Sequence, residues 1–175
     1  MPTRPTTRRQ FLRHSLAATT ATLSVPYWLS TTRARAATSA NDRPTIGVIG
    51  LGGRGRAIAR QAAAFGDIVA LCDVDRKHAE EVQTQFGGRA ELYGDYRKLL
   101  ERKDIEVILN ATPDHWHTAI NVAACKAGKD LYTEKPLTLT IDEGKTLCRI
   151  VEQTGRVVQV GTQQRSERQF QTAVE

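Results

Sequence analysis

The sequence predicts an α/β fold built on a doubly wound parallel sheet. Short apolar runs rich in β-branched residues alternate with helix-length segments from residue 45 onward, and this alternation is typical of parallel strands joined by helical crossovers. The first apolar run leads directly into a glycine-rich turn, and an acidic residue follows the second run. Together these features predict one sheet with helices on its faces.

Each element follows from a local pattern. Residues 45–49 form a short, β-branched and apolar run that is typical of a buried parallel strand. Further short runs predict strands at residues 68–72, 90–93, 105–110, 130–133 and 157–160. Apolar residues at helical spacing predict helices at residues 54–65, 76–86, 96–102, 115–127 and 141–153. The first helix would turn Phe65 toward the sheet. Asp95 and Thr140 are expected to cap helices, and Gly128 and Gly155 are expected to end them.

The charge distribution argues against a nucleic-acid-binding protein. The 175 residues carry a formal net charge of +6, and 40% of them are hydrophobic. Residues 1–36 hold six arginines and no acid, whereas the rest of the chain holds 19 basic and 19 acidic residues. The basic excess therefore belongs to the N-terminal segment and forms no patch on the predicted domain. The three cysteines are expected to be small buried apolar residues: Cys72, Cys125 and Cys148.

Residues 1–36 are predicted to be a twin-arginine signal peptide. Arg8 and Arg9 are followed by Gln-Phe-Leu, residues 15–32 carry no charge, and residues 34–36 fit an A-x-A cleavage site. An ordinary secretory signal and an uncleaved membrane anchor are the alternatives. We expect export by the twin-arginine machinery to a periplasmic or extracytoplasmic location, with residues 37–43 as a linker. That route carries folded proteins, which suits a nucleotide loaded in the cytoplasm.

The glycine-rich turn at residues 50–55 has the spacing G-x-G-x-x-G. In a strand–turn–helix context, Gly50 allows the tight turn, Gly52 lets the backbone approach a pyrophosphate, and Gly55 lets helix and strand pack closely. The helix start presents free N–H groups to the phosphates. The turn therefore predicts a Rossmann-type dinucleotide-binding domain.

Asp73 stands directly after the second predicted strand. A carboxylate there can accept hydrogen bonds from the adenosine ribose and repels a 2′-phosphate, which favours NAD over NADP. Arg76 is close in sequence and would soften that preference. The alternative is that Asp73 only caps the following helix.

Two further segments follow the fourth and fifth predicted strands, at residues 110–117 and 132–136. The carboxyl ends of parallel strands border one crevice. Lys135 is therefore a candidate to supply charge or a proton to a substrate oxygen, the alternative being a solvated surface lysine. His115 and His117 lack a third ligand in the sequence pattern, and no metal is expected.

The motifs at residues 50–55, 112–117, 127–137 and 160–165, together with Asp73, make the chain resemble the N-terminal half of the glucose–fructose oxidoreductase/inositol dehydrogenase/rhizopine-catabolism (Gfo/Idh/MocA) family. The resemblance covers roughly residues 43–168. It implies a cofactor domain at residues 44–165 and an NAD(P)-dependent oxidoreductase acting on a sugar, polyol or related carbohydrate.

The resemblance also implies roles for particular residues. Lys135 and His117 would be catalytic, with His117 near the nicotinamide, and a cis peptide bond would precede Pro136. Arg165 would face the nicotinamide or substrate side. The cofactor would contact Gly50, Gly52, Gly53, Arg54, Gly55, Asp73, Thr112, Pro113, His117, Glu134, Lys135 and Gln163.

Members of that family continue into a C-terminal α/β substrate domain, which would begin at residues 166–175 here and is otherwise absent. The chain is therefore expected to be a fragment or a truncated product, with a homo-oligomer formed only if that domain is present. Two other functions stay open. One is a non-catalytic nucleotide-binding module, and the other is an NAD-dependent glycoside hydrolase of the same fold.

Overall fold

The computed structural model describes residues 43–174, and these residues form a sheet of six parallel strands in the order β3-β2-β1-β4-β5-β6. The strand order reverses between β1 and β4, which is where open α/β sheets bind ligands at their carboxyl edge. The predicted fold class is confirmed. The strands are β1 (Thr45–Ile49), β2 (Asp67–Cys72), β3 (Glu91–Tyr93), β4 (Val107–Asn110), β5 (Asp130–Glu134) and β6 (Val158–Gly161).

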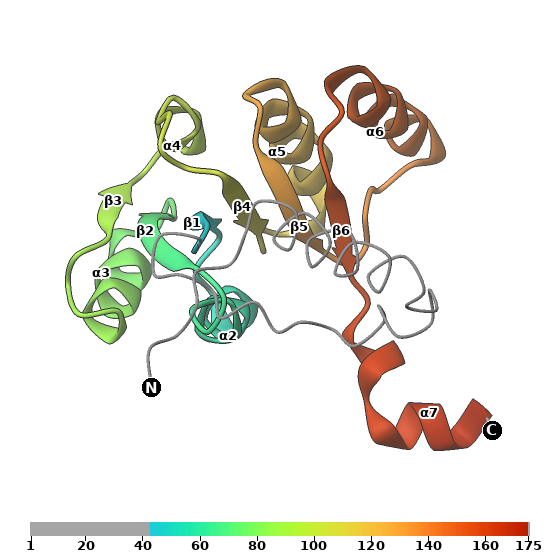
Figure 1. Cartoon of the computed structure of the whole chain (residues 1–175), viewed down its shortest axis with the longest axis horizontal. Coiled ribbons are helices and arrows are strands. Elements are labelled where there is room, and N and C mark those ends of the chain that lie inside the picture. The colour runs from blue at the N-terminus through green and yellow to red at the C-terminus, as the bar shows by residue number, and fades with distance from the viewer. Residues whose placement is uncertain (1–42, 175) are drawn as a thin grey trace, which may run out of the picture. The chain divides into compact units, whose positions relative to one another are not determined.

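Helices cover both faces of the sheet (Figure 1). One face carries α2 (Gly53–Ala62) and α3 (Arg76–Gln85). The other face carries α4 (Tyr96–Leu100), α5 (Asp114–Lys126) and α6 (Ile141–Thr154). A short 3-10 helix η3 (Gln163–Ser166) and α7 (Arg168–Val174) follow β6, and the sequence patterns did not predict either of them.

Each face has its own apolar core. Val48, Ile58 and Leu71 belong to the cluster under α2 and α3, whereas Ile108 and Ile120 belong to the cluster under α4 and α5. Alternate residues of a strand point to opposite faces, so the buried apolar residues of β1 and β4 contribute to both clusters. Full burial of one such side chain is worth about 1.5–3 kcal/mol.

Side-chain caps set where several helices begin. Asp95 accepts a hydrogen bond from Arg97 N at the start of α4, and Thr140 forms a reciprocal capping box with Glu143 at the start of α6. Gly128 and Gly155 follow α5 and α6 with positive φ angles of 78° and 63°, the left-handed backbone that ends helices. The predicted caps at Asp95 and Thr140 and the predicted helix ends at Gly128 and Gly155 are confirmed.

Two expectations about side-chain burial are wrong. Helix α2 ends at Ala62, and Phe65 is 77% exposed because the chain turns there to enter β2 through the tightly packed Gly66. Cys148 is exposed on α6, whereas Cys72 and Cys125 are buried as predicted. Cys148 lies on the exposed side of the amphipathic helix α6. A cysteine is small enough for either side of a helix, so its residue type alone did not predict which side it occupies.

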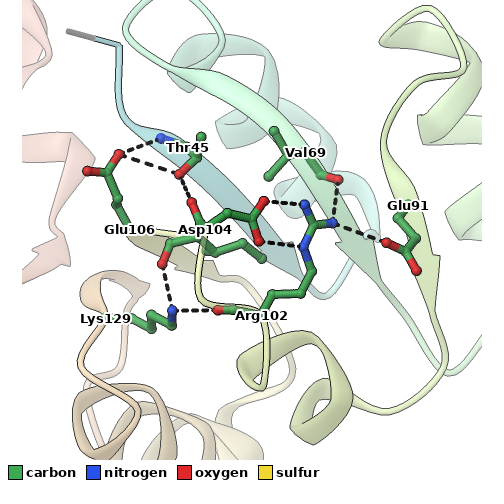
Figure 2. Close-up of polar contacts among 8 residues, drawn as sticks. Thr45, Val69, Glu91, Arg102, Asp104, Glu106 and Lys129 are labelled. Atoms are coloured by element: carbon green, nitrogen blue, oxygen red, sulfur yellow. Dashed lines mark hydrogen bonds and ion pairs between the residues drawn. The ribbon is translucent and has the colours of Figure 1, made fainter. Parts of the chain in front are cut away.

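A polar cluster joins the segments at the amino edge of the sheet (Figure 2). Lys129 is only 4% exposed, and its Nζ donates to the carbonyl oxygens of Arg102 at 2.6 Å and Ile105 at 2.7 Å. Arg102 pairs with Asp104 and Glu91 and donates to the Val69 carbonyl. The cluster fixes the loop between α4 and β4 at the edge opposite the glycine-rich turn.

The predicted signal peptide and most of the linker lie outside the described residues. Among residues 43–174, no helix combines the length and apolar character needed to cross a bilayer.

Candidate dinucleotide site

Two glycines of the turn between β1 and α2 are required by the packing. Gly50 has a φ of +85°, and a Cβ there would lie 2.7 Å from the backbone of Ala111 and Thr112. A Cβ on Gly55 would lie 1.8 Å from the Gly50 carbonyl oxygen. No side chain fits at either position, so these glycines let α2 begin directly against the strand ends.

The other two glycines face open space. Apart from their chain neighbours and the nearby backbone of α2, no atom of the described chain lies within 4 Å of a Cβ placed on Gly52 or Gly53. Gly52 is the N-cap of α2, and among the described residues no side chain caps this end and no acid stands in its first turn. The first N–H groups of α2 are therefore available to an anion. A pyrophosphate fits this cradle.

Asp73 braces the same turn. Its Oδ2 accepts a hydrogen bond from Leu51 N at 2.6 Å, and its Oδ1 accepts one from Asp75 N at 2.9 Å. The alternative that Asp73 caps the next helix is wrong, because Asp75 is the N-cap of α3 and accepts from Lys77 N. Arg76 pairs with Glu80 on its own helix.

A pocket of about 410 Å³ opens at the carboxyl ends of β1 to β4. Asp73, Thr112 and Pro113, all predicted site residues, line it, together with Trp116 and Val74. Val74 is 94% exposed and Trp116 44% exposed, so both present apolar surface to a flat ligand. Neither residue was assigned a role from the sequence. Val74 could have been recognised as a pocket residue, because it is an apolar residue between two acids directly after a strand.

Cys72 also lines this pocket, but it is not a reactive thiol. Burial, reinforced by the charges of Asp73 and Asp95, raises the pKa of Cys72 to about 12. Because the thiolate is the nucleophile, the neutral Cys72 side chain serves as part of the pocket wall.

A second group of predicted residues gathers at the end of β5. The Arg54 Nε donates to Glu134 Oε1 at 2.7 Å, and Glu134 is only 5% exposed. A Cβ on Gly161 would lie 2.6 Å from the Tyr132 hydroxyl oxygen and 2.9 Å from Glu134 Oε1. Burial, and then the Glu134 carboxylate, raises the pKa of Tyr132. The ion pair thus ties the first turn of α2 to β5.

Lys135 follows this pair and is exposed. The peptide bond between Lys135 and Pro136 is cis, as the resemblance implied. No hydrogen bond or ion pair joins the Lys135 ammonium to another residue of the described chain. Gln163 and Arg165 lie in η3, beyond the end of β6, and both are exposed.

His117 lies beneath the site rather than in the open pocket. It is 1% exposed, and its ring nitrogens lie 2.6 Å from the Pro136 carbonyl oxygen and 2.8 Å from that of Thr112. Both nitrogens are therefore engaged by backbone, which favours a positioning role over direct proton transfer. Within residues 43–174, no group of three His, Cys, Asp or Glu side chains is arranged to hold a metal ion.

The reversed strand order, the open glycine cradle and the braced Asp73 define a Rossmann-type dinucleotide-binding domain. Residues 45–162 match the sequence model described as the oxidoreductase family with an NAD-binding Rossmann fold. The chain belongs to this family, which is the Gfo/Idh/MocA family.

Individual relatives include both dehydrogenases and a glycosyl hydrolase. The chain is 34% identical to a glycosyl hydrolase family 109 protein of Solibacter usitatus, over 86% of this chain and 37% of that one. It is 35% identical to an inositol 2-dehydrogenase of Azotobacter vinelandii, over 66% of this chain and 36% of that one.

Solved structures include an inositol dehydrogenase whose fold is similar to that of this chain. The myo-inositol dehydrogenase of Lactobacillus casei, solved in complex with NAD(H) and myo-inositol, is 29% identical, with a TM-score of 0.68 over 72% of this chain and 38% of that one. The chain therefore spans well under half the length of the relatives that it matches.

Proposed function

We propose that this chain is the cofactor-binding part of an NAD-dependent oxidoreductase that acts on a polyol or a related carbohydrate. The observation that carries the proposal is the open cradle at Gly52 and Gly53 beside the braced carboxylate of Asp73. The polyol is inferred from relatives named inositol 2-dehydrogenase.

The residues around the turn account for cofactor binding. The first N–H groups of α2 would hold the pyrophosphate, and the pocket bordered by Val74 and Trp116 would take the adenosine. Each Asp73 oxygen already accepts one backbone hydrogen bond and keeps a second lone pair for a ribose hydroxyl. Its negative charge would repel a 2′-phosphate, so we propose NAD as the cofactor over NADP.

The chemical step would draw on the end of β5. When bound, NAD supplies a site that accepts a hydride from, or returns it to, a carbon atom of the substrate. Lys135 is exposed directly after the carboxyl end of β5, where its ammonium could hold a proton or a positive charge against a substrate oxygen. Glu134 is not available for this task because it is buried against Arg54.

A glycoside hydrolase of the same fold is the second candidate. The match to the glycosyl hydrolase family 109 protein covers 86% of this chain, more than the 66% covered by the inositol 2-dehydrogenase. The two activities differ in their products. A dehydrogenase accumulates NADH with a polyol, whereas the hydrolase releases a leaving group without net NADH. A non-catalytic nucleotide-binding module would do neither.

Titration of the purified chain with NAD tests the cofactor site. We expect saturable binding in wild type and a loss of about tenfold or more in affinity in Gly52→Ala, because the added methyl group fills space left for the pyrophosphate. Gly144→Ala is the matched control, since it adds the same group on α6, where a Cβ meets only the Thr138 hydroxyl at 3.5 Å. Wild type that stays folded but does not bind NAD contradicts the proposal.

We also propose that residues 1–36 direct export by the twin-arginine machinery, supported by Arg8-Arg9-Gln-Phe-Leu in an acid-free segment. A folded reporter carrying these residues should leave the cytoplasm, and replacing both arginines by lysine should retain it there. Export of the lysine variant would contradict the twin-arginine assignment.

A further inference from the structure

Two buried polar side chains lie one turn apart on the inner face of α5. His117 is 1% exposed and Asn121 is fully buried. Buried polar groups are nearly always hydrogen-bonded, because an unpaired one has lost its contacts with water and gained none in return. Their partners therefore show which parts of the chain this helix holds together.

His117 joins two loops that lie far apart in sequence. Its ring nitrogens contact the carbonyl oxygens of Thr112, just after β4, and Pro136, just after β5. Thr112 lines the pocket, and Pro136 immediately follows Lys135. One imidazole ring therefore spans the gap between the pocket wall and the segment that carries the exposed lysine.

Asn121 repeats the connection one turn deeper. Its Nδ2 donates to Thr133 Oγ1 at 3.1 Å, and its Oδ1 accepts from Asn110 Nδ2 at 2.8 Å. Asn110 Oδ1 in turn accepts from the Thr112 hydroxyl at 2.8 Å. Asn110 and Thr133 are paired across β4 and β5, so this level fixes the strand ends while His117 fixes the loops beyond them.

We propose that His117 is a positioning residue that sets the distance between the loops at residues 112–113 and 135–136, and thereby the affinity for the nicotinamide half of the cofactor. The inference rests on the proposed function. In a doubly wound sheet, one half of a dinucleotide lies over the strands on each side of the switch point. Asp73 stands at the end of β2, on the β1–β3 side, and the pocket reaches from there to the loop at residues 112–113. That loop therefore borders the middle of the cofactor, and the loop after β5 lies on the side that receives the nicotinamide half.

The test compares NAD with ADP-ribose, which lacks the nicotinamide. Wild type should bind NAD more tightly than ADP-ribose. His117→Phe fills similar volume without ring nitrogens, and it should lower the ratio of NAD affinity to ADP-ribose affinity about tenfold. His117→Gln, whose side-chain NH2 group can still donate to a carbonyl oxygen, should retain an intermediate ratio. Leu147→Ala is the control, since it removes a buried side chain of α6 and should lower Tm without changing the ratio.

Each result has one meaning. An unchanged ratio in His117→Phe, or equal losses for both ligands, overturns the inference. If His117→Phe does not fold, His117→Gln decides, and a wild-type ratio in that variant overturns the inference. Wild type that binds both ligands equally also overturns it and leaves the cofactor site standing. Folded wild type that binds neither ligand overturns the proposed function itself.

Discussion

Glycine does two different jobs within one six-residue turn. At Gly50 and Gly55 a side chain would collide with backbone, whereas at Gly52 and Gly53 it would point into open space. The first pair is required for folding, and the second pair is required only if something else must occupy the space. Substitutions within this turn can therefore distinguish an effect on folding from an effect on ligand binding.

Gly55→Ala should therefore destabilise the fold. The new methyl group would lie 1.8 Å from the Gly50 carbonyl oxygen, and backbone must move to admit it, at a cost of about 3 kcal/mol or more. Urea unfolding followed by circular dichroism measures the change. Gly52→Ala, by contrast, should unfold at nearly the wild-type urea concentration, and an equal loss in both variants would contradict the distinction.

The buried and exposed cysteines should differ in reactivity. Burial raises the pKa of Cys72 to about 12, so its thiol stays protonated as the pH rises through 8, whereas Cys148 is exposed. A maleimide or a soluble disulfide reagent should modify Cys148 in the folded protein and reach Cys72 only after unfolding. Peptide mass mapping identifies the modified residue. Labelling of Cys72 in the native state would show that the pocket opens more than the structure indicates.

At the scale of elements, apolar patterning predicted the strands because both faces of a parallel sheet are buried. The caps Asp95 and Thr140 were predictable because a short polar side chain before a helix commonly accepts a hydrogen bond from a free backbone N–H group of the first turn. The end of α2 was not, because the turn at Phe65 depends on contacts of Gly66 with the distant Pro44 and Ile46.

The site was predictable to a similar degree. The glycine turn and Asp73 carry recognisable local chemistry, and the structure brings both to one edge. The position of His117 could not be read from sequence, because its partners are backbone carbonyls, one of them 19 residues away. Every residue carries a backbone carbonyl oxygen, so the identity of a residue does not show whether its carbonyl accepts a hydrogen bond from a side chain. The contact between Arg54 and Glu134 could not be predicted either, because the two side chains belong to residues 80 positions apart and meet only in the folded sheet.

The loop between α4 and β4 depends on Lys129. Lys129→Met keeps the aliphatic stem but leaves the Arg102 and Ile105 carbonyls without the bonds they now accept, so we expect a loss of about 1–3 kcal/mol. Chemical unfolding measures the loss. Lys126→Met on the exposed side of α5 is the control and should change little. Unchanged stability in Lys129→Met would mean that water replaces the ammonium at this edge.

At the scale of the whole domain, the polar cluster around Lys129 and the ligand site lie at opposite edges of the sheet. The ion pairs of Figure 2 occupy its amino edge, and the cradle and pocket occupy its carboxyl edge. Substitutions at one edge should therefore leave the other unaffected, since sites far apart usually act independently. Lys129→Met should accordingly bind NAD as wild type does.

Binding should also stabilise the domain as a unit. A ligand that binds only the folded state at about 100 times its Kd adds about 2.7 kcal/mol to the free energy of unfolding. We expect NAD to raise Tm by several degrees in a concentration-dependent manner, measured by differential scanning fluorimetry. The Gly52→Ala variant should show little shift. An equal shift with NADP would contradict the discrimination assigned to Asp73.

The two hydrogen bonds that Asp73 accepts from Leu51 and Asp75 limit how this domain can be re-engineered. The same carboxylate that would exclude a phosphorylated ribose also holds the glycine turn in shape. Replacing Asp73 by a small neutral residue to admit NADP would remove the hydrogen bonds that hold the glycine-rich turn. Binding of NAD and of NADP would both depend on the shape of that turn. A change of coenzyme preference therefore requires a second substitution that gives the Leu51 amide a new acceptor.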